Sequence, residues 1–182
     1  MSLSGIIKQL KYINPNKATG HDLIPRRVLK ETAEQIAPYL EIIFNKSIKL
    51  GTVLTDWLIG NVIPILKKGD KTDPVNYHPV SLTSVPCKIM EHIILRSIMN
   101  YLDNNKLLSQ YQYGSRKNHP CQQQVIDTSE DLARIRDNKG QADILILDFS
   151  KAFDTVLHRY LVHKLRNKSI DKYTENWIDN WI

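Results

Sequence analysis

The segment Asp143-Ile-Leu-Ile-Leu-Asp-Phe-Ser-Lys-Ala-Phe-Asp-Thr-Val-Leu-His158 decides which fold we expect for the chain. Within it, Ile144 to Leu147 form an uninterrupted apolar run, and Gly140 precedes the run as a break in regular structure. A short apolar run between turn residues predicts a fully buried strand. Asp148 would then lie where the strand ends, so that its carboxylate can leave the core and meet water or a metal ion.

Asp148 is therefore the first candidate functional residue. Mg²⁺ is the usual partner of such a carboxylate in phosphoryl transfer, because it prefers oxygen ligands and keeps positions open for substrate. The residues alone leave a second interpretation open, since an aspartate at the end of a strand is often a turn or capping residue. Asp154 is most simply the N-cap of a following helix.

The charge and the cysteine content of the chain indicate its cellular compartment and the class of partner that it binds. The 182 residues carry 25 Lys and Arg against 19 Asp and Glu, a net charge of +6 that favours a polyanion such as nucleic acid. Cys87 and Cys121 lie far apart, which predicts reduced thiols in an intracellular protein, nuclear or cytoplasmic and not secreted. The N-terminus does not resemble a signal peptide and no apolar run approaches membrane-spanning length, so we expect no membrane partner.

Apolar periodicity and turn residues predict mostly helices and one hairpin. Helices are expected over residues 3–12, 36–50 with Gly51 closing the last turn, 84–102, 120–136 and from about 156 to 165, with a last apolar helical segment over 176–182. Strands are expected over 61–66 and 77–82, joined by a hairpin tip at 67–74. The last segment carries Trp177 and Trp181, and we expect a part of a parent domain outside this chain to cover them.

Three loops carry basic or aromatic residues that can face nucleic acid. The hairpin tip holds Lys67, Lys68 and Lys71, and it is either a solvated turn or a mobile basic flap that closes over a triphosphate. The loop at 14–25 carries Lys17 and is either a plain surface loop or a loop that follows a phosphate backbone. The loop at 107–117 carries Tyr113, Arg116 and Lys117. Bases could stack on the tyrosine and phosphates could meet the two cations, although core or surface tyrosines are commoner.

The stretch Leu147-Asp-Phe-Ser-Lys-Ala-Phe-Asp-Thr-Val156 resembles the first catalytic palm motif of reverse transcriptases from non-LTR retrotransposons, the long interspersed elements of the jockey type. The resemblance implies that Asp148 is a catalytic aspartate that binds Mg²⁺. It also implies that the backbone at Lys151 and Ala152 faces the incoming deoxynucleoside triphosphate. Phe153 would be the bulky gate that rejects a ribose 2′-OH, and an RNA template and a DNA primer would be the partners.

Three further segments resemble motifs of this family, and they follow one another in the family's order. The loop at 14–25, the stretch from Lys67 to Ser84 and the stretch from Gln112 to Asn118 match its fingers motifs. The resemblance implies that Lys67, Lys68, His78, Arg116 and Lys117 bind triphosphate and that Lys17, Lys71 and Tyr113 bind nucleic acid. The chain departs from the family at Leu23 and Asn118, where glycine is usual, at His78, where an arginine is usual, and at Ser115, where an aromatic residue is usual.

These observations predict an α+β fold of helix-rich polymerase fingers with a small antiparallel sheet, plus the first strand and helix of an incomplete palm. We expect residues 1–140 to form the fingers with an N-terminal helical segment, and residues 141–182 to begin a truncated palm. The family's second carboxylate motif, an aromatic-Ala-Asp-Asp hairpin, is not found in the sequence. Two other carboxylates are candidates for its role. Asp143 would lie roughly 16 Å from Asp148 along a strand, too far to share a metal ion. Asp154 could approach Asp148, although a helix cap already explains its presence.

The expected function is thus that of a fragment of an RNA-directed DNA polymerase that is inactive alone and binds Mg²⁺ weakly or not at all. Two alternatives stay open: a nucleic-acid-binding module that has lost catalysis, and an interaction fragment with an open sheet edge and a Trp-rich tail. The sequence makes no prediction about the oligomeric state.

Overall fold

The structure is a computed structural model that describes residues 1–149, 152–153 and 155–182. Its residues form two compact units, one made of Met1–Asn100 with His158–Ile182 and the other of Tyr101–Leu157. Lys151 and Asp154, for which the sequence predicts a triphosphate contact and a helix cap, lie outside the described residues.

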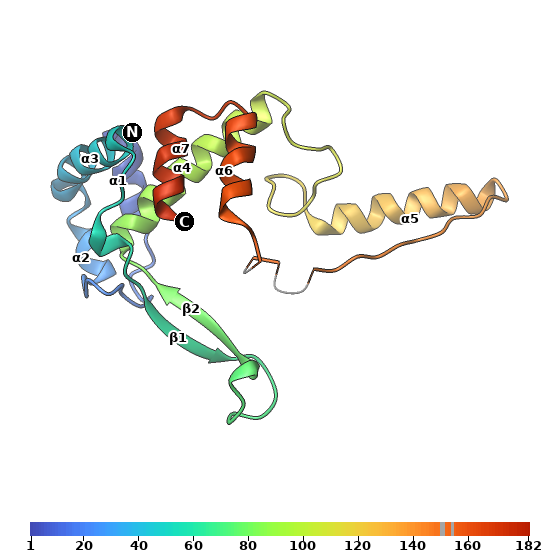
Figure 1. The fold of residues 1–182 in the computed structure, drawn as a ribbon, viewed down its shortest axis with the longest axis horizontal. Coiled ribbons are helices and arrows are strands. Elements are labelled where there is room, and N and C mark those ends of the chain that lie inside the picture. Colours follow the sequence, from blue (N-terminus) through green and yellow to red (C-terminus); the bar gives the residue numbers. More distant parts are fainter. Residues whose placement is uncertain (150–151, 154) are drawn as a thin grey trace. The chain divides into compact units, whose positions relative to one another are not determined.

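The first unit is mainly helical and contains one small sheet (Figure 1). Its elements are α1 (Leu3–Lys11), α2 (Arg26–Glu31), α3 (Ala33–Leu50), β1 (Asn61–Leu66), β2 (Tyr77–Leu82), α4 (Val85–Asn104), α6 (His158–Asn167) and α7 (Lys172–Trp181), with single 3-10 turns at Thr55–Trp57 and Pro74–Asn76. The last turn of α4 belongs to the second unit. The α+β fold and the antiparallel hairpin predicted from the sequence are confirmed.

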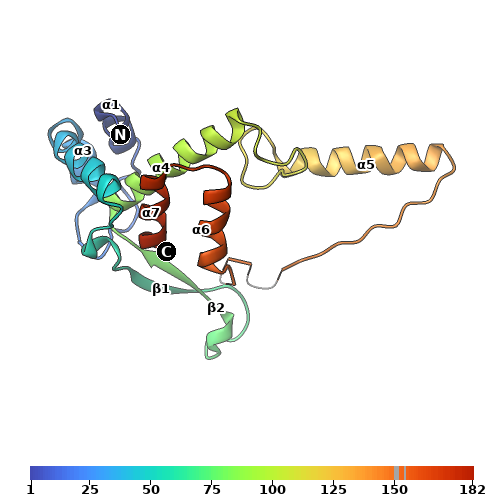
Figure 2. The same cartoon turned by 45° about the horizontal axis from the view of Figure 1, so that its top comes forward.

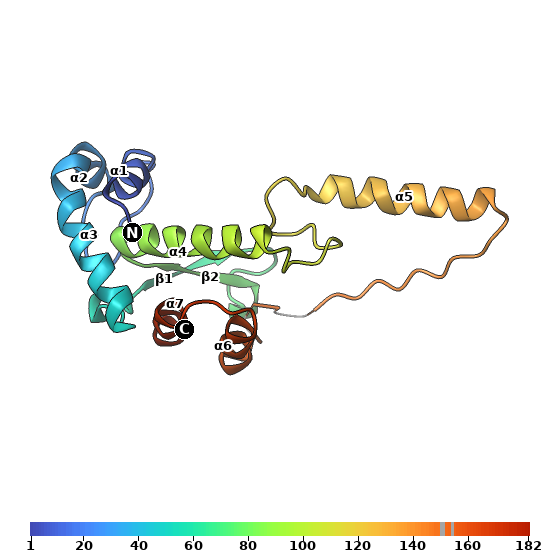
Figure 3. The same cartoon turned by 90° about the horizontal axis from the view of Figure 1, so that it is seen from above.

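One hydrophobic core joins the two ends of the sequence in this unit. Helix α3 packs against both α1 and α7, and α7 packs against α6 (Figures 2 and 3). Ile6, Leu10, Phe44 and Met90 are fully buried together with Trp177, which comes from the last helix. The residues from α1, α3 and α4 are spaced so that each helix presents one apolar face to this core.

The Trp-rich C-terminal segment is covered by the chain itself, so the expectation of a cover from outside the chain is wrong for Trp177. This side chain is 2% exposed, and its indole N–H donates to Ser47 Oγ at 2.9 Å. Asn180 Oδ1 accepts the backbone N–H of Val53 at 2.7 Å, and Trp181 stacks on Trp177. Periodicity reveals an apolar face but does not identify the segment, here 130 residues earlier, that meets it.

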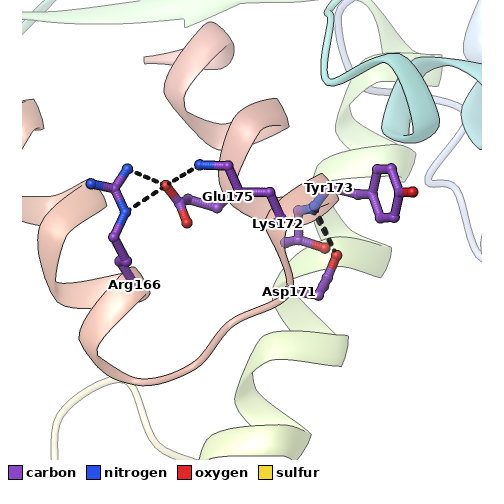
Figure 4. Close-up of polar contacts among 6 residues, drawn as sticks. Arg166, Asp171, Lys172, Tyr173 and Glu175 are labelled. Atoms are coloured by element: carbon purple, nitrogen blue, oxygen red, sulfur yellow. Dashed lines mark hydrogen bonds and ion pairs between the residues drawn. The ribbon is translucent and has the colours of Figure 1, made fainter.

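A buried carboxylate orders the junction between α6 and α7 (Figure 4). Glu175 is 3% exposed and accepts hydrogen bonds from Arg166 Nε at 2.9 Å and from Lys172 Nζ at 3.2 Å. The bond from Arg166 is the main reason that the pKa of Glu175 lies below its usual value. Asp171 begins α7 by accepting the backbone N–H groups of Tyr173 and Thr174.

The β-hairpin carries a proline at the same level of both strands. Pro64 lies directly opposite Pro79 in the antiparallel register, and neither residue has a backbone N–H. The two prolines therefore form a non-hydrogen-bonded pair. At such a pair the backbone N–H groups of other residues point away from the partner strand. Each outer edge of the hairpin thus lacks a donor at this level, which hinders the addition of a further strand.

The second unit contains one long helix and no strand among its described residues. Helix α5 (Cys121–Asp137) forms where the sequence predicts it, but none of its residues is buried. Residues 144–147, predicted to be a buried strand, run as an extended and exposed segment in which Leu145 is 82% and Ile146 86% exposed. The prediction of burial is wrong, because burial of a strand needs neighbouring strands and the described residues offer none here.

The loop before α2 contains a leucine in a left-handed backbone conformation. Leu23 has φ +55° and its side chain is 72% exposed. The family motif that this loop resembles has glycine at this position, and glycine alone adopts such a backbone without steric cost. For a residue with a branched side chain the conformation costs about 1–2 kcal/mol.

We predict that Leu23→Gly raises the free energy of unfolding by about 0.5–1 kcal/mol, since the relief of strain exceeds the added entropy of the unfolded chain. Urea denaturation checks this value. Leu23→Ala is the matched control, because it removes the exposed side chain and keeps the strain, and we expect it to leave stability nearly unchanged. A less stable Leu23→Gly variant would contradict the explanation.

We also predict that Glu175 makes stability depend on acid pH. Its folded-state pKa lies below the ordinary value of 4.5, so its contribution is complete above about pH 4.5 and is lost as the pH falls through the lower folded value. Glu175→Gln should lower stability at pH 7 and flatten this acid-dependent loss in urea titrations. Glu31→Gln, an exposed carboxylate on α2, is the control; an equal effect there would refute the assignment.

Candidate functional site

The tip of the β1–β2 hairpin presents three lysines on an ordered turn. The backbone N–H of Lys67 donates to the carbonyl of Asn76 at 2.8 Å, and the Asn76 side chain donates to the carbonyl of Asp70 at 3.0 Å. The hydroxyl of Tyr77 donates to the carbonyl of Lys71 at 2.9 Å. These bonds fix the backbone of the tip, while the side chains of Lys67, Lys68 and Lys71 are exposed.

The acidic residues of the tip serve the turn rather than the lysines. Asp70 Oδ1 accepts the backbone N–H of Thr72 at 2.9 Å, and this bond lowers the pKa of Asp70. Asp73 Oδ1 accepts the backbone N–H of Val75 at 3.0 Å. Within the described part of the chain, no ion pair joins an acid to the three lysines of this tip. Their positive charges are therefore available to an anion.

His78 lies on β2, next to the tip. It is paired with Ile65 in the register, one step from the Leu66–Tyr77 pair where the tip begins, and its side chain is exposed. A histidine ring cannot form the two parallel hydrogen bonds by which an arginine holds a phosphate. The structure thus brings His78 close in the ladder to the lysine-bearing tip, as the sequence predicts.

In the second unit, Arg116 holds its own loop in place. Its Nε donates to Asp103 Oδ1 at 3.2 Å and its Nη1 donates to the carbonyl of Ser109 at 3.0 Å. The guanidinium is mostly covered, with 16% of the side chain exposed. Arg116 therefore has a structural role at the end of α4, and Lys117 beside it is exposed.

Tyr113 is likewise engaged within its unit. Its hydroxyl donates to Asp127 on α5, which raises the pKa of Tyr113 and lowers that of Asp127. Its ring meets the ring of His119 edge to face at 6.1 Å between centroids. A base could stack on this ring only where His119 leaves it uncovered.

Two left-handed residues surround Arg116. Ser115 has φ +57° and Asn118 has φ +61°. Asparagine is among the few residues other than glycine that adopt this conformation readily, so Asn118 can replace the glycine that is usual in the family motif. Asn118 therefore adopts its left-handed backbone at little steric cost, in contrast to Leu23.

Asp148, Ala152 and Phe153 are all exposed. Phe153, for which the resemblance implies a gate, is 94% exposed, so it is not packed against the described residues. Residues 1–149, 152–153 and 155–182 contain no group of three or more His, Cys, Asp or Glu side chains that could hold a metal ion. Among the described residues, Asp148 therefore lacks the further ligands that a complete Mg²⁺ site needs.

The predicted site residues are divided between the two units. The first unit contains Lys17, Lys67, Lys68, Lys71 and His78, and the second contains Tyr113, Arg116, Lys117, Asp148, Ala152 and Phe153. Within the first unit, the three lysines and His78 share one hairpin, and Lys17 lies elsewhere, on the loop before α2.

Sequence patterns did not reveal a basic cavity near Lys17. A cavity of about 310 Å³ brings Lys17 together with Arg26 from α2 and Lys88 from α4, with Tyr12 also in its lining. Arg26 and Lys88 belong to none of the motifs found in the sequence, so no local signal pointed to them. In the same loop, Nδ1 of His21 is buried and has no hydrogen-bond partner among the described residues.

No helix in the described residues is both long and apolar enough to cross a membrane.

The comparison with protein families gives a match over residues 65–182, more than half of the chain. The matching family model is that of the reverse transcriptase (RNA-dependent DNA polymerase). This match includes the hairpin tip and Asp148 but not the loop that carries Lys17.

The chain is also similar to polymerases of mobile elements. It is 32% identical over 151 residues to the RNA-directed DNA polymerase from the mobile element jockey of Drosophila melanogaster, covering 82% of this chain and 16% of that protein. It is 30% identical over 152 residues to the probable RNA-directed DNA polymerase from transposon X-element of the same species, covering 83% and 17%.

A more distant relative is the retrovirus-related Pol polyprotein from the type-1 retrotransposable element R2 of Popillia japonica, 26% identical over 128 residues and covering 70% of this chain and 17% of that protein. The chain thus spans about one sixth of the length of these relatives. The resemblance to polymerases of non-LTR retrotransposons, first seen in the motifs, is confirmed. On the family match, the chain belongs to the reverse transcriptase (RNA-dependent DNA polymerase) family.

Proposed function

We propose that the chain is the triphosphate- and template-facing part of an RNA-directed DNA polymerase of a non-LTR retrotransposon. Its substrates would be deoxynucleoside triphosphates, an RNA template and a DNA primer, and Asp148 would be the first catalytic carboxylate. The observation that carries this proposal is the ordered hairpin tip, where Lys67, Lys68 and Lys71 have no acidic partner among the described residues.

The tip suits a polyphosphate because of its electrostatics. Phosphoryl transfer is catalysed mainly by positioning and by neutralising charge on the phosphate oxygens. Three ammonium groups on a fixed backbone can do this without first breaking an ion pair. His78 would supply a weaker contact than the arginine that is usual in the family.

We propose further that the isolated 182 residues do not catalyse polymerisation. Chemistry with two metal ions needs carboxylates from at least two motifs, so that the attacking and the leaving oxygen are both stabilised. The 182 residues contain no Asp-Asp pair, and Asp148 is exposed and outside any metal-binding group of the described residues. Magnesium, when bound in a complete site, would polarise the phosphate and lower the pKa of the attacking hydroxyl.

A second candidate is a nucleic-acid-binding module without catalysis. The net charge of +6 favours it, as do the tip lysines, which form no ion pair with a described acidic residue, and these features do not depend on Asp148. The two candidates differ in the role of Asp148. Only the polymerase interpretation requires this residue to be catalytic within a larger protein.

Primer extension separates catalysis from binding. We predict that the isolated chain, with Mg²⁺, a primed RNA template and deoxynucleoside triphosphates, incorporates no more nucleotide than its Asp148→Asn variant. Sequencing-gel analysis of labelled primer is the measurement. Incorporation that is lost in Asp148→Asn would overturn the proposed inactivity.

We predict that the double variant Lys67→Glu/Lys68→Glu binds an RNA–DNA duplex at least about tenfold more weakly than the parent chain. The slope of log affinity against log salt should fall by about 1.8, because two phosphate contacts to a duplex are lost. Fluorescence anisotropy at several salt concentrations measures both quantities.

The matched control for this experiment is Lys46→Glu/Lys49→Glu, which reverses two exposed charges on α3. We expect it to change affinity about twofold at most, and to leave the salt slope unchanged. Equal losses in the two double variants would show that net charge alone explains binding and would contradict a specific role of the tip.

A further inference from the structure

A second basic site lies in the first unit, away from the hairpin. It is a cavity of about 310 Å³ whose lining includes Tyr12, Lys17, Arg26, Lys88 and His92, and no Asp or Glu lines it. The charged groups come from the loop after α1, the start of α2 and the first turns of α4. Three separate segments thus converge on one pocket of positive charge.

Close packing holds the Lys17 loop in this position. A Cβ atom at Gly20 would lie 2.6 Å from the carbonyl oxygen of Thr83 and 2.7 Å from the backbone of Ser84, so the loop touches the chain just before α4. Arg26 Nε donates to the carbonyl of Ala18 at 2.8 Å, which ties the loop to α2 as well. The cavity is therefore formed before any ligand arrives, which reduces the entropy lost on binding.

The positive charges of the cavity act on one another. Lys17, Arg26 and Lys88 form no ion pair within the described part of the chain. Burial lowers the pKa of Lys88, and the charges of Arg26 and Lys17 lower it too, against the opposite effect of Glu91. Like charges held together in a half-buried place are stabilised by an anion that bridges them.

An exposed aromatic ring stands beside these charges. Tyr12 caps the C-terminus of α1, and its side chain is 77% exposed although it lines the cavity. A tyrosine next to Lys and Arg side chains is the combination by which proteins bind single-stranded nucleic acid, the ring stacking on a base and the cations meeting the backbone. Bases in a duplex are already stacked, so this arrangement selects an unpaired strand.

We infer that this cavity binds one nucleotide unit of a single-stranded nucleic acid, with Lys17, Arg26 and Lys88 on a phosphodiester and Tyr12 against the adjacent base. The inference rests on the proposed function, because it assumes that the chain meets nucleic acid. It adds a strand-binding site to the hairpin tip, formed by residues outside the family motifs apart from Lys17. Its ligand contains a phosphate, which a free phosphate ion could also supply.

The test is fluorescence anisotropy with a labelled 12-nucleotide single-stranded RNA of mixed sequence. The variant Lys17→Gln/Lys88→Gln should bind about tenfold more weakly, and its salt slope should fall by about 0.7, because both lysines contact the same phosphodiester. The control Lys46→Gln/Lys49→Gln removes the same charge from α3 and should bind within about twofold of the parent chain. Circular dichroism and thermal unfolding establish that each variant is folded.

The aromatic contact has its own pair of variants. Tyr12→Ala should weaken binding of the single strand about tenfold, whereas Tyr12→Phe keeps the ring and should bind nearly as the parent does. Neither variant should affect binding of an RNA–DNA duplex. The inference is overturned if Tyr12→Ala binds the single strand normally, or if the α3 control loses as much affinity as Lys17→Gln/Lys88→Gln.

Two comparisons identify the ligand and separate this inference from the proposed function. Inorganic phosphate, added at constant ionic strength, should displace the RNA only at a phosphate concentration far above that of competing unlabelled RNA; equal potency would indicate a free-phosphate site and overturn the inference. If the parent chain binds neither RNA nor duplex, the proposed function fails as well. If Lys67→Glu/Lys68→Glu weakens binding and Lys17→Gln/Lys88→Gln does not, the inference alone fails.

Discussion

The insertion of Trp177 into the core is the interaction on which the first unit depends. The indole is buried and donates to Ser47, whose own hydroxyl donates to the carbonyl of Thr52 at 2.5 Å. This chain of two bonds joins α7 to the end of α3, where Gly51 adopts φ +63° and leaves no room for a side chain beside Asn176. The last helix therefore packs into the same core as α1, α3 and α4 and fixes the end of α3.

The sequence predicts those features that are local. Gly51 ends α3 in the left-handed conformation expected of a helix C-terminus, and the hairpin has the predicted strands at Asn61–Leu66 and Tyr77–Leu82. Features that depend on contacts between residues far apart in the sequence could not be predicted from local patterns. The apolar run at 144–147 has the composition of a buried strand, yet burial depends on neighbouring strands, and Trp177 finds its cover far away in the sequence.

The same division holds for the candidate sites. The motifs located the lysines of the hairpin tip, whose geometry is set by the turn that contains them, while the functional roles of Asp148 and of the other motif residues stay predictions. The motifs could not indicate that Arg116 donates to Asp103 or that Tyr113 donates to Asp127, because a motif specifies residue types and not their hydrogen-bond partners. The cavity with Arg26 and Lys88 could not be predicted from motifs, since its lining comes from three segments that are separate in the sequence.

We propose that the first unit meets nucleic acid with two separate basic surfaces, the hairpin tip and the cavity beside Lys17. Hydrogen–deuterium exchange of the 182-residue chain, with and without a single-stranded RNA joined to an RNA–DNA duplex, tests this claim most directly. The account predicts slower exchange of backbone amides at residues 14–26 and 67–76 when the nucleic acid is bound, with α3 unchanged. Protection confined to α5 and residues 138–149, or spread evenly over the chain, would contradict it.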